Sequence, residues 1–350
     1  MRILAIETSC DDTSVALVDI KGSNFKILEN IISSQIKIHK KWGGVVPNLA
    51  RREHQKNLPI ILKKVLSNKE KPDIVSVTKG PGLEPCLWVG INLARELAEK
   101  IKKPLIGINH IEAHVLVNFI SEDSKIKINK KLFPAICLIV SGGHTQLVLM
   151  KGLGKYKIIG ETRDDAAGEC FDKIAKILGL GYPGGPIIDN KADQWRSKSI
   201  ISKKNIKLPR PMMNQKNYDF SFSGLKTAVL YDFKSRSQKA RKSESYIQEI
   251  SSEAQQSIID VLISKTIKAI KEFKVNSLIL GGGVTASKEL KKQFRDKIKK
   301  EFPKVEILIP SPSFSTDNAL MVATAAFLHK DDKNKNWKTM KANANLKIDK

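Results

Sequence analysis

The chain has 350 residues, 41% of them hydrophobic and 28% charged, and its 61 Lys and Arg against 36 Asp and Glu give a net charge of +25. This composition is that of a folded, soluble protein, and the length exceeds what one hydrophobic core usually serves, which predicts two lobes or one long α/β domain. The positive charge indicates a polyanionic partner, although abundant Lys throughout the chain fits a general compositional bias equally well.

No apolar run in the sequence is long enough to cross a membrane. The apolar run before Glu7 is also too short for a signal peptide. We therefore expect a cytoplasmic protein with no membrane partner.

The chain opens with two short predicted strands, residues 3–6 and 14–18, around the polar turn ETSCDDT. The hydroxyls of this turn are suited to phosphate contact. Asp11 and Asp12 are suited to holding a cation or orienting water, or they are simply exposed acidic residues. Asp11 is a candidate for proton handling.

Residues 48–66 and 89–100 have the apolar spacing of helices, and residues 74–78 read as a strand. The motif HIEAH follows at positions 110–114. A separation of four residues puts His110 and His114 on one helical face, where both imidazoles can bind one metal ion, and Glu112 falls off that face. The order differs from the HExxH of zinc proteases.

The second half repeats the opening pattern. Strands are predicted at 135–140 and 146–150 around the turn SGGHT, with helices at 166–178, 251–273 and 286–300 and a buried strand at 277–280. Such a repeat predicts two related α/β lobes, one formed by residues 1–120 and 305–350 and the other by 121–304. Proline and glycine at 181–186 predict a rigid turn.

Several late motifs carry groups suited to a nucleotide or a metal. Asp172 lies on a predicted amphipathic helix, and Gly185 and Asp189 follow it. The three glycines of LILGGGVTAS allow close approach of a backbone, without the spacing of a Rossmann or P-loop motif. Asp317, in PSPSFSTDNA, is a third metal-ligand candidate or only the cap of the helix that begins near Asn318. Two His and one carboxylate suit Fe(II) or Zn(II).

These motifs together resemble the Kae1/TsaD family, once labelled O-sialoglycoprotein endopeptidases. The shared motifs, in chain order, are ETSCDDT, WGGVVP, LARREH, HIEAH, VSGGHT, DDAAGE, FDKIAK, YPGGP, FSFSGLKTA, LGGGV and STDNA. The resemblance spans nearly the whole chain, and the bacterial form of the family looks most similar.

The resemblance implies a two-lobed, duplicated actin-like and Hsp70-like ATPase fold, the ASKHA fold. It implies an acyltransferase that moves a threonylcarbamoyl group from threonylcarbamoyl-AMP to N6 of adenosine 37 in tRNAs reading codons that start with A, forming t6A37. It implies one iron or zinc ion held by His110, His114 and Asp317. The implied substrate-binding residues are Ile139, Val140, Ser141, Gly142, Gly143, Asp172, Gly185, Asp189 and Ser287.

One position departs from the family pattern: this chain reads GGVTAS where GGVAAN is usual, so Ser287 stands where an adenosine-contacting Asn is expected. His144 joins Asp11 as a candidate for proton handling or for orienting the substrate. The implied partners are tRNA and TsaB-like and TsaE-like proteins, and cations expected to follow the tRNA phosphates are Arg51, Arg52, Lys204 and Lys226.

Three other classes of function remain open at this point. They are an ATPase of the same fold, a non-catalytic scaffold subunit, and a metallopeptidase. The metal triad argues against a kinase-like ATPase, a peptidase needs a general base beside the metal, and a scaffold would tolerate loss of His110.

Overall fold

The structure is a computed structural model that describes residues 1–67, 71–121, 123–198, 206–331 and 337–350. The chain forms two compact units. Unit 1 comprises Met1–Asn129 and Pro310–Lys350, and unit 2 comprises Lys130–Ile309. No helix in the described ranges has both the length and the apolar character that a membrane span requires.

The sheet of unit 1 has five strands in the order β3-β2-β1-β4-β5. β1 pairs antiparallel with β2 and parallel with β4. β1 and β4 are buried on both faces; β1 is apolar from Ile3 to Ile6, whereas β4 also buries Ser76 and Thr78, whose hydroxyls are hydrogen-bonded. Their bounds are β1 (Arg2–Glu7), β2 (Asp12–Lys21), β3 (Asn24–Ser34), β4 (Ile74–Gly80) and β5 (Leu105–Asn109).

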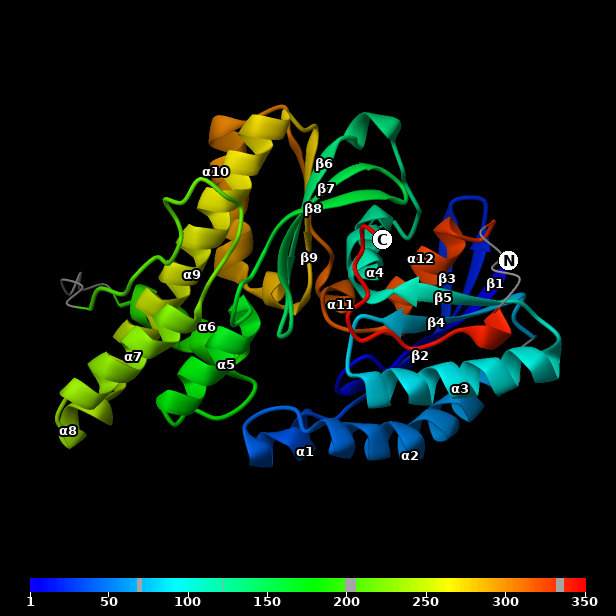
Figure 1. The fold of residues 1–350 in the computed structure, drawn as a ribbon, viewed down its shortest axis with the longest axis horizontal. Coiled ribbons are helices and arrows are strands. Elements are labelled where there is room, and N and C mark those ends of the chain that lie inside the picture. The colour runs from blue at the N-terminus through cyan, green and yellow to red at the C-terminus, as the bar shows by residue number, and fades with distance from the viewer. Residues whose placement is uncertain (68–70, 122, 199–205, 332–336) are drawn as a thin grey trace. The chain divides into compact units, whose positions relative to one another are not determined.

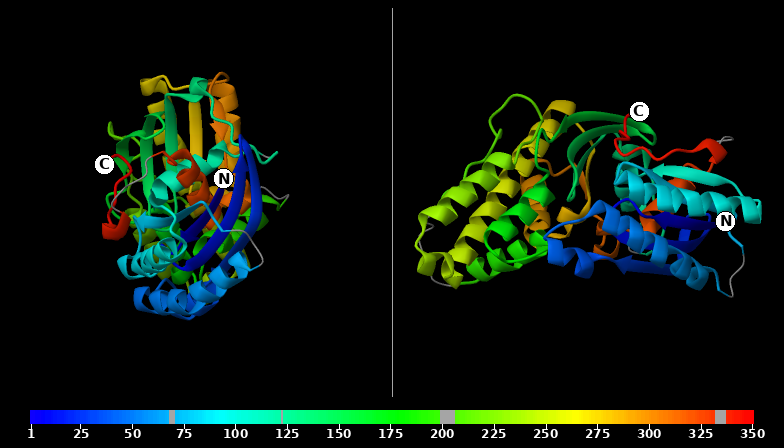
Figure 2. Two further views of the ribbon diagram at one scale, coloured as in Figure 1. Left: turned by 90° about the vertical axis from the view of Figure 1, so that its right-hand side faces the viewer. Right: turned by 60° about the horizontal axis from the view of Figure 1, so that its bottom comes forward.

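Helices cover both faces of this sheet (Figures 1 and 2). α2 (Pro47–Leu66) and α3 (Glu84–Ile101) pack on one face, and α4 (His110–Leu116) and α12 (Ala319–Leu328) lie on the other. Pro47 stands at the first turn of α2, where a missing N–H costs no helical hydrogen bond. The short helices α1 (Ile36–His39) and α11 (Pro312–Ser315) complete the unit.

Unit 2 repeats the sheet of unit 1. Read in the same direction, its strand order is β8-β7-β6-β9-β10. β6 pairs antiparallel with β7 and parallel with β9, as β1 does with β2 and β4. This repeat of order and polarity confirms the predicted duplicated α/β fold. The strands are β6 (Ala135–Val140), β7 (Thr145–Gly152), β8 (Lys155–Glu161), β9 (Ser277–Gly281) and β10 (Glu306–Leu308).

One core joins this second sheet to its helices, which Figure 1 shows gathered on one side of the strands. The longest is α9 (Glu244–Phe273), which packs against α6 (Gly184–Arg196). The others are α5 (Ala167–Ile177), α7 (Ser223–Ser235), α8 (Gln238–Arg241) and α10 (Lys288–Glu301).

The segment 181–186, predicted as a rigid turn, is a turn only in its first half. Gly181 has a φ of 98°, but α6 already begins at Gly184 after Pro183. The first N–H groups of a helix have no partner within it, so Pro and Gly are tolerated there. A Cβ on Gly184 would lie 2.4 Å from the carbonyl oxygen of Phe171, so glycine permits this close approach of α6 to α5.

Candidate metal centre and substrate-binding residues

Two histidines and one aspartate of unit 1 converge, although Asp317 is about 200 residues from the histidines in the sequence. His110 is the first residue of α4, directly after β5, and His114 follows one turn later. Nε2 of His114 lies 3.1 Å from Oδ1 of Asp317, and Nε2 of His110 lies 3.6 Å from the same oxygen. One ligand atom from each of the three residues lies within 4.8 Å of the others.

Asp317 is positioned by the start of α12. Asn318 caps this helix, because its side-chain oxygen accepts hydrogen bonds from the N–H groups of Leu320 and Met321. Ala319 N donates to the buried hydroxyl of Ser14 at 2.9 Å, which ties the start of the helix to β2. The cap is therefore Asn318, and the Asp317 carboxylate is directed toward the two histidines.

Glu7, at the end of β1, lies behind His110 and was not singled out from the sequence. Its carboxylate is completely buried and accepts a hydrogen bond from Nδ1 of His110 at 3.1 Å. Thr78 and Ser9 N also donate to it. Burial lowers the pKa of His110, but the negative charges of Asp317 and Glu7 outweigh burial and raise it to about 9. An acidic residue that ends an apolar strand is the sequence signal that would have identified Glu7.

This arrangement fits a metal ion by its donor chemistry. A histidine ligand usually donates its second ring N–H to a carboxylate, which fixes the orientation of the ring, and Glu7 holds His110 in this way. With Nδ1 of His110 engaged, its Nε2 is directed toward Asp317 and His114. His110, His114 and Asp317 therefore form a candidate metal site, with a donor set suited to iron or zinc.

The ETSCDDT turn is not an exposed acidic loop, because Asp11 and Asp12 are partly buried. Burial raises the pKa of Asp11, and it raises the pKa of Asp12 to about 7, with a further contribution from Asp317. Most hydroxyls of the turn already bond within unit 1: Thr8 donates to the carbonyl of Cys86, and Thr13 bonds Nδ1 of His54 at 2.7 Å. Asp11 and Asp12 are therefore the groups of this turn whose surroundings favour the protonated form.

In unit 2, the candidates Ile139 and Val140 end β6, and Ser141, Gly142, Gly143 and His144 form the turn into β7. The turn is closed by hydrogen bonds between Ser141 and His144, 2.8 Å from Ser141 N to His144 O and 3.1 Å from His144 N to Ser141 Oγ. Gly142 and Gly143 are exposed, with nothing within 4 Å of a Cβ placed on either.

The start of α5 contacts the turn between β6 and β7. Gly168 N donates to the carbonyl of Ser141 at 3.1 Å, and a Cβ on Gly168 would lie only 2.5 Å from that oxygen. Gly282, in the glycine run after β9, has a φ of 89° and would place a Cβ 2.5 Å from the carbonyl oxygen of Val140. The end of β6 is thus enclosed by backbone that only glycine allows to approach so closely.

The remaining candidates lie on α5, α6 and the start of α10. Oδ1 of Asp172 accepts a hydrogen bond from Gly184 N at 2.6 Å, and Gly185 is the next residue of α6. The hydroxyl of Ser287 donates to Oδ1 of Asp189 at 2.6 Å, and Gln255 donates to the same oxygen. Ser287 also caps α10. Asp189 and Ser287 are therefore brought together, as are Asp172 and the start of α6.

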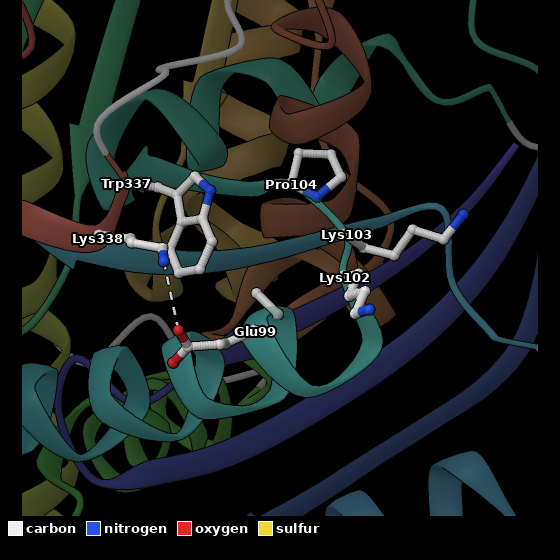
Figure 3. Close-up of a pocket in the computed structure, with 7 residues that line it drawn as sticks. Glu99, Lys102, Lys103, Pro104, Trp337 and Lys338 are labelled. Carbon is white, nitrogen blue, oxygen red and sulfur yellow. Dashed lines mark hydrogen bonds and ion pairs between the residues drawn. The ribbon is translucent and has the colours of Figure 1, made fainter.

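The candidate tRNA-contacting cations are spread over both units. Arg51 and Arg52 lie exposed on α2, Lys226 lies on α7 within 3.7 Å of Asp165, and Lys204 lies outside the described residues. A surface pocket of unit 1 (Figure 3) is lined by Lys102, Lys103 and Trp337, with Lys338 paired to Glu99 at 3.3 Å, and includes none of the candidate residues.

Comparison with known proteins gives consistent results. Residues 26–324 match the family described as TsaD, tRNA N6-adenosine threonylcarbamoyltransferase. Proteins of that name from Thermosipho africanus and Geobacillus kaustophilus are 45% and 42% identical, covering 99% and 92% of this chain and 100% and 90% of theirs.

Among solved structures, full-length HypF in its phosphate- and nucleotide-bound form superposes with a TM-score of 0.54 at 12% identity. The match covers 96% of this chain and 47% of that one. HypF of T. kodakarensis gives a TM-score of 0.50 at 14% identity, with 93% and 47% covered. At these identities the likeness concerns the fold alone.

Proposed function

The chain belongs to the TsaD family of tRNA N6-adenosine threonylcarbamoyltransferases, and from that premise we propose that it transfers a threonylcarbamoyl group from threonylcarbamoyl-AMP to N6 of adenosine 37. The acceptor is a tRNA that reads codons starting with A, and the product is t6A37. The observation that supports this proposal most is the convergence of His110, His114 and Asp317, with Glu7 orienting His110.

The proposed cofactor is one Fe(II) ion per chain, with Zn(II) as the alternative, held by the two histidines and Asp317. Such an ion supplies Lewis-acid stabilisation of negative charge that develops on a substrate oxygen. Glu7 keeps His110 in the tautomer whose Nε2 is the ligand, and Asn318 holds the helix that carries Asp317.

The residues of unit 2 are proposed to bind the adenylate portion of the donor. Backbone N–H groups of Gly142 and Gly143 are suited to phosphate oxygens because both residues are exposed and have no side chain of their own. Asp172, Gly185 and Asp189, with Ile139, Val140 and Ser141, are proposed to contact the nucleoside, and Ser287 acts through its bond to Asp189.

Attack by N6 on the carbamoyl carbon releases AMP and requires removal of one proton from nitrogen. Asp11 is proposed to accept that proton, because burial raises the pKa of its carboxyl and so increases its basicity. His144 is proposed to orient the substrate at the edge of β7. The proposed partners are TsaB-like and TsaE-like proteins, and the proposed compartment is the cytoplasm.

Incubation of the purified protein with labelled threonylcarbamoyl-AMP and unmodified tRNA, followed by digestion to nucleosides, tests the function. Labelled t6A is the expected product. Asp317→Asn should abolish both bound metal and product, whereas Asp73→Asn, whose side chain is 52% exposed in the same unit, should leave both unchanged. Release of free threonine without t6A, or full transfer by Asp317→Asn, would refute the proposal.

A further inference from the structure

Glu112, the middle residue of HIEAH, has no part in the proposed metal site, and its environment assigns it another task. Its side chain is 11% exposed, and Oε1 accepts a hydrogen bond from Nε2 of His329 at 2.9 Å. His329 is the C-cap residue of α12. The pair therefore joins the middle of α4 to the far end of the helix that follows Asp317.

The two helices are consequently tied at both ends of α12. At the start of α12, Asp317 meets His114 of α4 at 3.1 Å, and at its end, His329 meets Glu112. α4 and α12 are in contact, and Figure 1 shows them side by side. A shift of α4 along α12 would separate both pairs together.

Helix α4 needs such external support because it has only seven residues. An isolated helix of this length is not stable in water, so its position depends on its contacts with the rest of unit 1. Asn109 caps its start and donates to the carbonyl of Lys347, and Asn118 donates to the carbonyl of His114 just past its end. Glu112–His329 is the contact that fixes its position relative to the end of α12, as His114–Asp317 does at the start.

We propose that Glu112 and His329 are a positioning pair that sets the register of α4 against α12 so that His110, His114 and Asp317 bind one metal ion with full affinity. The inference rests on the proposed metal site, and neither residue belongs to the group of candidate metal ligands. Residues that hydrogen-bond a metal ligand directly typically contribute about 10- to 100-fold to metal affinity, and this pair, which acts through the positions of α4 and α12, is expected at the lower end of that range.

The test measures the dissociation constant for Zn(II) by competition with a chromogenic chelator, using the full chain. His329→Ala and Glu112→Ala should each weaken binding by about 10-fold. The double variant should be no weaker than either single variant, because one contact is lost in all three. His329→Arg, which restores an N–H donor to Glu112, should recover affinity to within a few-fold of the parent.

Lys330→Ala is the matched control, because Lys330 is the next residue and packs over the ring of Phe327 at 4.7 Å. It should bind Zn(II) as the parent does. Unchanged affinity in His329→Ala and Glu112→Ala, additive losses in the double variant, or no recovery with His329→Arg would each overturn the positioning pair. A parent protein that binds no Zn(II) would overturn the metal site itself, and normal Zn(II) binding without t6A formation would overturn only the proposed function.

Discussion

The buried carboxyl of Asp12 should lower the free energy of unfolding of the protein, and Asp12→Asn should restore it. Burial raises the pKa of this carboxyl from the usual 3.8 to about 7, and the nearby negative charges of Asp317, Asp11 and Glu7 add to the shift. Among the described residues, its buried Oδ1 has no hydrogen-bond partner. The folded protein therefore disfavours the ionised form of Asp12.

The sign and size of the effect follow from proton linkage. The unfolded chain releases this proton near its usual pKa, and the folded chain keeps it to about pH 7, so the penalty grows between these values and is complete above pH 7. At about 1.36 kcal/mol per pKa unit, a gap of about three units gives an upper limit of about 4 kcal/mol. Asn has no charge to bury at any pH.

Urea unfolding of the chelator-treated protein between about pH 5 and about pH 8 measures this difference. Metal is removed because a bound cation would favour the ionised carboxylate. Asp12→Asn should be more stable than the parent at about pH 8, and the advantage should shrink as the pH falls. The reasoning is refuted if the variant is no more stable at about pH 8, or if its advantage does not change with pH.

Asp164→Asn is a control of opposite sign. Burial raises the pKa of Asp164, but hydrogen bonds from Ser221 and Ser223 outweigh burial, and the net shift is downward. Its stabilising effect is therefore present above the usual pKa of an aspartate and is lost as the pH falls through the lowered value. Asp164→Asn should be less stable than the parent at about pH 8.

Three further predictions concern the candidate residues. Ser287→Ala removes the cap of α10 and should lower the free energy of unfolding by about 1 kcal/mol. It should also raise the KM for threonylcarbamoyl-AMP, because the bond to Asp189 is lost. Ser287→Asn should keep the cap and lower the KM. Gly168→Ala should displace the Ser141 carbonyl, 2.5 Å from the new Cβ, and raise the KM for the donor with unchanged metal content; an unchanged KM would contradict the close approach. Asn318→Ala should lower the free energy of unfolding, measured by urea unfolding, by about 1 kcal/mol and should weaken metal binding. Metal affinity equal to that of the parent would show that the cap does not position Asp317.

The duplicated α/β fold was predictable because its central strands carry a local signal. The apolar runs 3–6 and 135–140 are buried on both faces, and each is followed by a polar turn and a second strand. β3 and α6 were not predicted. β3 is an edge strand with exposed residues along much of its length, and α6 begins in a run of Gly and Pro that usually breaks helices.

The candidate site was predictable in part for a related reason. His110 and His114 lie one helical turn apart, so their spacing alone indicates a shared face. Their meeting with Asp317 depends on the packing of α12 against α4, which no local pattern encodes. The sequence offered Asp317 as either a ligand or a helix cap, and the motif resemblance favoured the ligand. Glu7 was missed although it ends an apolar strand, and its bond to His110 appears only in the folded structure. His329 was missed because its role appears only when α4 and α12 pack together.

Metal reconstitution tests the central claim most directly. Protein stripped of metal by a chelator is titrated with Fe(II) under anaerobic conditions, and the rate of t6A formation from threonylcarbamoyl-AMP and tRNA is measured at each step. The rate should rise from near zero and reach its plateau at one equivalent per chain, and His110→Ala should neither bind Fe(II) nor respond. Full transfer by the metal-free protein, or by His110→Ala, would contradict the proposed role of His110, His114 and Asp317.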